Sequence, residues 1–187
     1  FSWKDFQAKN NNELVAIYGN YVNRVVVLIN KYYEGKVPAP KFYTNKDKEI
    51  INSVKLLRDK IGFAIEKFRF RESNSEMINI ARIGNKYLAD NEPWKLINID
   101  PGRTKTILFI SIQIVSALAF LSEPFLPFTS SKLKEILKIK KQIIWNDILN
   151  FNIIKPGQKI SKESFLFEKV EDKAISNQYQ KLERNKK

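Results

Sequence analysis

The side chains in this sequence best suited to recognising another molecule are an asparagine–arginine pair. Asn20 and Arg24 stand four positions apart, so on a helix they lie about 40° apart around the axis and face away from the apolar stripe of Leu14 and Tyr18. An amide supplies a donor and an acceptor, and a guanidinium supplies a rigid donor fork, so the pair can bind the edge of an unstacked base. An ordinary polar face, with Arg24 paired to a carboxylate, fits the same spacing.

A tryptophan provides a second candidate contact for nucleic acid. Trp94 directly follows Pro93, and a tryptophan on a segment stiffened by proline can serve as a stacking platform for a base. The alternative is a buried tryptophan that fills the base of a helical bundle. Asn23 is a further candidate RNA contact, although it lies near the boundary of its helix face and could bond locally.

Catalytic and metal-binding chemistry has little support in the composition. The chain has no histidine and no cysteine, which removes the commonest general base and metal ligand, thiolate sites and disulfides. It also lacks a GxGxxG fingerprint, a P-loop and an HExxH motif. We therefore expect no catalytic residue, no metal site and no cofactor in this chain.

The charge of the chain favours a polyanionic partner. There are 33 Lys+Arg against 20 Asp+Glu, a formal net charge of +13, which attracts nucleic acid at long range. The bland alternative is a lysine-rich chain whose charge is incidental, for example a basic helical protein-interaction module. Charge alone does not separate the two.

The elements that must position these residues are helices. Apolar residues recur at spacings of three and four over long stretches, and prolines separate the stretches. The patterns predict a helix over Asn12–Tyr33, a second over Asp47–Arg71, a third that Ser73 or Ser75 caps and that ends before Pro93, a fourth over Thr104–Leu121 after an Asp100-Pro101-Gly102 turn, and a fifth capped by Thr129 or Ser130. The expected fold class is all-α, an antiparallel helical bundle of about five helices.

Membrane insertion is not expected. The most apolar run, Ile107 to Leu121, contains Ser111, Gln113 and Ser116 and is shorter than the roughly 20 apolar residues of a membrane span. It is typical of a buried core helix. No signal peptide is visible, and we expect a cytoplasmic protein. Because the chain opens on Phe1 and its single methionine is Met77, a longer parent protein is also expected.

Two regions are expected along the chain, a helical domain over residues 1–145 and a C-terminal extension over residues 146–187. In the extension, Phe151 to Ile154 and Ile160 to Phe167 could be extended, and Glu171 to Leu182 has a helical pattern. The extension is therefore predicted to be partly irregular with a terminal helix.

Several stretches together resemble one known family. They are FSWKDF (residues 1–6), ELVAIYGNYVNR (13–24), GKVP (35–38), ARIGNKYL (81–88), EPWK (92–95), PFLPFT (124–129) and LFEKVED (166–172). In order and spacing they resemble the C-terminal helical anticodon-binding domain of bacterial methionyl-tRNA synthetases. The helical anticodon domain of another class I synthetase is the nearest alternative, and the EPWK segment with the GNYVNR helix argues against it.

The resemblance implies a function and a set of contacts. Asn20 and Arg24 match the helix positions that contact the methionine anticodon, CAU, and Pro93 and Trp94 match the segment that orders and stacks on its first base. It implies methionine tRNA and the catalytic domain of the same parent chain as partners. The family's catalytic motifs, HIGH and KMSKS, are absent, so ATP and methionine would be used by the parent methionine-tRNA ligase and this chain alone is expected to be inactive.

Overall fold

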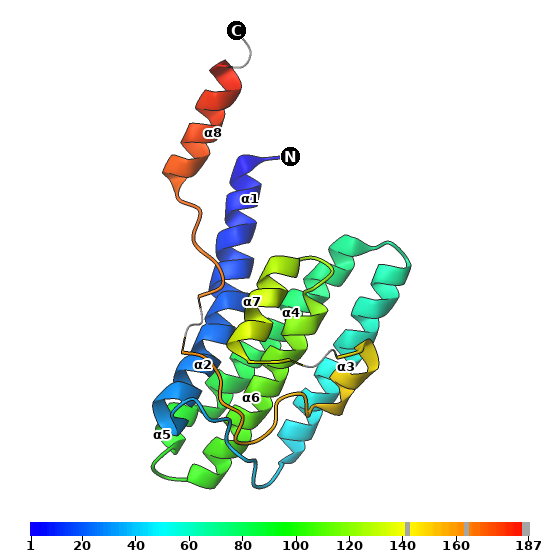
Figure 1. Cartoon of the computed structure of the whole chain (residues 1–187). Coiled ribbons are helices and arrows are strands. Elements are labelled where there is room, and N and C mark those ends of the chain that lie inside the picture. Colours follow the sequence, from blue (N-terminus) through cyan, green and yellow to red (C-terminus); the bar gives the residue numbers. More distant parts are fainter. Residues whose placement is uncertain (141–142, 163–164, 185–187) are drawn as a thin grey trace.

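The computed structural model describes residues 1–140, 143–162 and 165–184, and this part of the chain is a helical bundle without a β-strand (Figure 1). The elements are, in order, α1 (Trp3–Lys9), the π-helix η1 (Asn10–Gly19), α2 (Asn20–Tyr33), α3 (Asn45–Glu66), α4 (Phe70–Asn91), α5 (Pro93–Leu96), α6 (Pro101–Leu121), α7 (Pro127–Ile136), the 3-10 helix η2 (Trp145–Asn150) and α8 (Asp172–Arg184). The predicted all-α class is confirmed.

The first predicted helix is longer than its apolar pattern indicates. Helical structure runs without a break from Trp3 through α1, η1 and α2 to Tyr33, whereas the pattern placed its start at Asn12. The predicted end is correct, because Glu34 takes a left-handed conformation with φ of 54° and stops the helix. α1 buries no residue, so no apolar periodicity marks it in the sequence.

The second and third predicted helices form the hairpin of α3 and α4. Thr44 and Asp47 make a reciprocal capping box at the start of α3. α4 ends at Asn91, before Pro93 as predicted, but the predicted serine cap is wrong because α4 already begins at Phe70. Ser73 is buried inside the helix, where its hydroxyl donates to the carbonyl of Ile61 on α3 at 3.1 Å.

α6 forms the centre of the bundle. It is long and apolar enough to cross a membrane, but 94% of its most apolar window is buried by the rest of the protein, which confirms the predicted core helix. The predicted turn at Asp100-Pro101-Gly102 is in fact the start of this helix. Asp100 caps it by accepting a hydrogen bond from the Arg103 amide at 2.8 Å, and Pro101 occupies the first turn.

α7 starts earlier than predicted. Pro127 lies in its first turn and Leu126 precedes it, so Thr129 and Ser130 are not its caps. Ser130 instead donates its hydroxyl to the carbonyl of Ala119 on α6 at 2.5 Å, which joins the two helices.

The C-terminal extension packs on the bundle through three buried isoleucines, Ile148, Ile154 and Ile160. The Gln113 amide on α6 donates to the Ile154 carbonyl at 2.6 Å and accepts from the Ile153 amide at 2.9 Å. The segments predicted as extended contain no strand in the described residues, and an isolated antiparallel bridge between Lys36 and Lys159 lies just before the second of them. The boundary after residue 145 stays a prediction.

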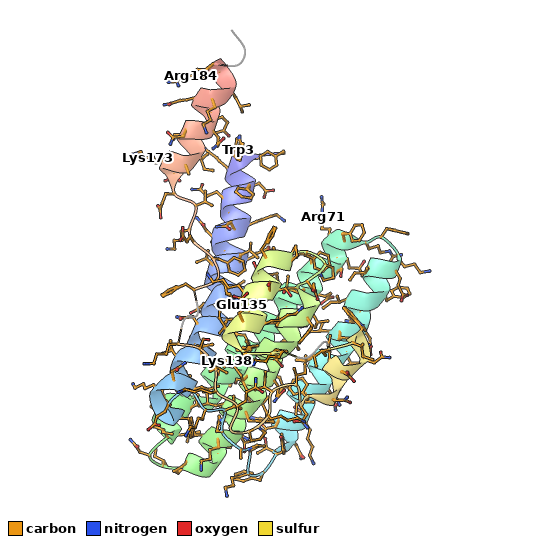
Figure 2. All side chains as sticks on the ribbon, viewed as in Figure 1. Trp3, Arg71, Glu135, Lys138, Lys173 and Arg184 are labelled. Atoms are coloured by element: carbon orange, nitrogen blue, oxygen red, sulfur yellow. The ribbon has the colours of Figure 1, made fainter. Side chains whose placement is uncertain are left out.

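The terminal helix, predicted over Glu171 to Leu182, is α8, which lies beside α1 (Figure 1). The Gln7 amide of α1 donates to Asp172 at 2.9 Å. Figure 2 shows Trp3 and Lys173, from the two ends of the chain, projecting beyond the bundle on the same side. The two terminal helices thus form one extension of the bundle.

Candidate functional site

The packing of α2 against α4 fixes the positions of the candidate contact residues. Tyr21, the residue after Asn20, is fully buried and lies over Gly84 of α4, where an added Cβ would be 2.3 Å from the tyrosine ring. The Tyr21 hydroxyl donates to the Ser111 carbonyl of α6 at 3.0 Å. Burial raises the pKa of Tyr21, so its hydroxyl stays protonated and keeps donating this hydrogen bond. The missing side chain at Gly84 allows the two helices to approach closely.

Arg24 and Trp94 are brought together by this packing. The guanidinium carbon of Arg24 lies 5.2 Å from the centre of the Trp94 ring, within the range of a cation–π interaction. Trp94 is half-buried, and Arg24 makes no ion pair with a carboxylate in the described ranges. The described residues therefore contain no carboxylate partner for Arg24, and Trp94 is not enclosed in the core, while a polar face around Arg24 agrees with its hydrogen bond to Asn85.

Pro93 and Trp94 lie on the one-turn helix α5. Pro93 is buried at the first position of α5, directly after Glu92, which takes a left-handed conformation with φ of 39°. The pyrrolidine ring fits this position because its fixed φ is helical and the missing amide hydrogen has no helical partner there. The chain therefore turns sharply at the end of α4 and presents Trp94 toward α2.

Asn85 was not predicted from the sequence, and it connects the site. Its amide nitrogen donates to the Ile17 carbonyl in η1 at 3.0 Å, and its oxygen accepts from the Arg24 guanidinium at 3.4 Å. The side chain is thus inserted where the π-helix gives way to α2 at Asn20. Asn85 thus holds the Arg24 guanidinium by a hydrogen bond from α4. This role depends on the packing of α4 against η1 and α2, which the sequence alone does not show.

Asn20, Arg24 and Asn85 line a shallow hollow of about 410 Å³. Asn20 is exposed on its rim, with Arg24 and Asn85 in its wall, and Arg82 and Lys86 of α4 add positive charge. Lys86 pairs with Asp90 at 2.9 Å, whereas Arg82 has no ion pair within the part of the chain that the structure describes. The hollow combines hydrogen-bonding side chains with cations, and Arg24 in its wall also contacts the Trp94 ring, which lies outside the lining. This set of groups suits a nucleotide.

Asn23 does not line this hollow. Asn23 lies with Asn20 on the neighbouring face of the continuous N-terminal helix formed by α1, η1 and α2. Both residues line a second hollow of about 350 Å³. The described residues contain no group of three or more acidic side chains arranged to hold a metal ion.

Comparisons with known proteins give one consistent family. A family model described as the anticodon binding domain of methionyl tRNA ligase matches residues 37–186. The methionine--tRNA ligase of Flavobacterium psychrophilum is 51% identical over the whole chain, and that of Christiangramia forsetii is 52% identical. The chain spans about 27% and 28% of the length of these two relatives.

The fold also has a solved counterpart. The apo methionyl-tRNA synthetase of Mycobacterium tuberculosis superimposes on this chain with a TM-score of 0.81, covering 91% of it and 35% of the solved chain. The sequence identity in that comparison is 18%, so it bears on the fold alone.

Proposed function

This chain belongs to the family of anticodon-binding domains of methionyl-tRNA ligase, and we propose that it recognises the CAU anticodon of methionine tRNA through Asn20, Arg24, Pro93 and Trp94. The observation that supports this assignment most strongly is the placement of Arg24 at 5.2 Å from the Trp94 ring, beside the exposed amide of Asn20. Stacking and hydrogen-bonding groups then meet at one place on the surface.

The four residues have different roles in this proposal. Trp94 stacks on the first anticodon base, and Pro93 holds the turn that presents it. Asn20 and Arg24 bind the base edge, because cytosine offers an N4 donor beside acceptors at N3 and O2, and an amide with a guanidinium complements that pattern. Uracil at the same position replaces the N4 donor with an oxygen acceptor. Asn23 is a further candidate RNA contact on the adjoining face.

The wider function follows the family. We propose that this domain serves a methionine-tRNA ligase whose catalytic domain uses ATP and methionine, and that neither is bound by this chain. The partners are then methionine tRNA and that catalytic domain, with no membrane, and the setting is cytoplasmic. The basic net charge of +13 is consistent with attraction to tRNA.

The test is a titration of this chain with two anticodon stem-loops that differ only in the first anticodon base, cytosine or uracil. We expect tighter binding of the cytosine RNA, by about tenfold or more, since one well-matched base edge contributes about 1 to 3 kcal/mol. Arg24→Ala should lower this ratio toward one.

Arg71→Ala is the matched control, because it also removes one arginine. Arg71 lies at the start of α4, far from the end of that helix where Asn85 contacts Arg24 (Figure 2). It should leave the cytosine-to-uracil ratio unchanged. Equal binding of the two stem-loops by the unaltered chain would contradict the proposed function.

A further inference from the structure

The C-terminal segment forms one wall of a second hollow beside the candidate site. The hollow is bounded by Val15, Ala16 and Gly19 of η1 on one side and by residues 165–167 with Lys169 on the other. We propose that it binds a second unstacked base of the anticodon loop, with Phe165 as the stacking surface. This inference rests on the proposed function, since it assigns a neighbouring nucleotide to the same RNA.

The second hollow adjoins the first. Ala16 and Asn20 line both, so the exposed amide of Asn20 stands on the ridge between them. An RNA strand whose first anticodon base lies at Trp94 and Arg24 would place a neighbouring nucleotide across this ridge. Splayed bases of a single strand are bound in this way, each on its own aromatic or apolar surface.

The lining of the second hollow suits a base more than a charged group. Its walls are mainly apolar, and Phe165 is 78% exposed although it is a large aromatic side chain. Gly19 lets the Phe167 ring pack closely against η1. A Cβ there would lie 3.2 Å from both the Leu14 carbonyl and the Phe167 ring. Lys169 at the edge supplies a cation for the phosphate that would follow the base.

Side-chain amides of η1 hold the C-terminal wall of the second hollow, residues 165–170, in place. Asn11 donates to the Val170 carbonyl at 3.0 Å and accepts from the Val170 amide at 2.9 Å. Asn10 donates to the Glu168 carbonyl at 3.0 Å. The Phe167 ring packs on Tyr18 with their centres 5.4 Å apart. The segment is therefore ordered before RNA arrives, which lowers the entropy cost of binding.

The test uses the complete 187-residue chain and a set of CAU stem-loops, each with one loop base removed to leave an abasic site. Phe165→Ala should weaken binding of the intact stem-loop about tenfold, the range expected for loss of one base–aromatic stack. One abasic position other than the first anticodon base should remove this sensitivity, because the base that stacks on Phe165 is then absent.

Phe128→Ala on α7 is the control, since Phe128 is 90% exposed and lies outside both hollows. It should leave affinity unchanged. Asn11→Ala should reproduce part of the loss, and combining it with Phe165→Ala should add little, because both act through the same wall.

Unchanged affinity of Phe165→Ala overturns the inference. An equal loss on every abasic RNA also overturns it, because Phe165 would then act on the backbone or on folding. If in either case the chain still prefers cytosine to uracil at the first position, the proposed function stands without the second subsite. If that preference is absent from the unaltered chain, the proposed function itself fails.

Discussion

The guanidinium of Arg24 lies over the Trp94 ring at 5.2 Å, although Arg24 belongs to α2 and Trp94 to α5, which are far apart in the sequence. Because this contact exists in the protein without RNA, RNA does not have to bring the two side chains together. Arg24 covers part of the ring, so a base that stacks on Trp94 meets a surface already oriented by a cation–π interaction. Preorganisation of this kind reduces the side-chain entropy lost on binding.

Trp94→Ala should weaken binding of the CAU stem-loop by about 1 to 3 kcal/mol, because it removes the stacking surface. The protein should stay folded, since Trp94 is half-buried and the loss should be well below the roughly 3 to 5 kcal/mol for a fully buried tryptophan. Stem-loop titration and thermal denaturation of the same variant check both parts. Trp94→Phe should retain most of the affinity, and an unfolded Trp94→Ala protein would remove the argument for a surface platform.

Asn85→Ala should lower discrimination between cytosine and uracil at the first anticodon position without abolishing binding. The Arg24 guanidinium then loses its hydrogen bond to Asn85, and the Ile17 carbonyl loses a donor. Trp94 remains, so we expect a smaller loss of affinity than for Trp94→Ala. The measurement is the ratio of the two dissociation constants. Lys86→Ala, one position along α4, is the control and should weaken both stem-loops about equally.

Helix periodicity and proline placement were enough to predict most of the bundle, whereas the four main site residues were proposed from side-chain chemistry and from the family resemblance. Part of the errors arises because contacts between distant segments override local signals. Ser73 and Ser130 have the chemistry of helix caps, but each is buried and donates to a carbonyl of a neighbouring helix. Asn85 shows the same limit, because its role depends on a carbonyl in η1 that no spacing rule connects to it.

Gly84→Ala should destabilise the domain by about 1 to 3 kcal/mol, as expected for overpacking. The added Cβ would lie 2.3 to 2.6 Å from the ring of Tyr21, and that ring is fully buried and cannot move aside. Because the same contact sets the distance between α2 and α4, selectivity for cytosine should fall as well. Urea denaturation and stem-loop titration measure the two effects.

Gly102→Ala is the control for a glycine on a helix with room for a methyl group. Its nearest neighbour would be an oxygen of Asp100 at 3.4 Å, an ordinary contact distance. Since alanine favours a helix over glycine, this variant should be as stable as the original chain or slightly more so. A Gly84→Ala protein of unchanged stability would mean that the helices can separate without cost.

A buried ionic cluster joins α3, α4 and α6, and it predicts how stability depends on pH. Asp47 is 0% exposed. It accepts hydrogen bonds from the Arg103 guanidinium at 2.8 Å, through one of two contacts, and from the Tyr87 hydroxyl at 2.5 Å. Burial raises the pKa of Asp47, but the hydrogen bonds from Arg103, Tyr87 and the backbone of Thr44 outweigh it and lower the pKa to about 2.

Because this pKa is depressed in the folded state, ionised Asp47 stabilises the protein above the ordinary value of 3.8, and the contribution is lost as the pH falls toward about 2. The expected loss is about 2 kcal/mol over that window. Asp47→Asn should be less stable than the original chain at pH 7 and should flatten this part of the profile. Asp90→Asn, which breaks only the exposed pair with Lys86, should leave it in place. Urea denaturation between pH 2 and pH 7 measures how the free energy of unfolding of each variant depends on pH. If this dependence had the same slope in the original chain and in Asp47→Asn, the bonds from Arg103 and Tyr87 would not hold Asp47 ionised.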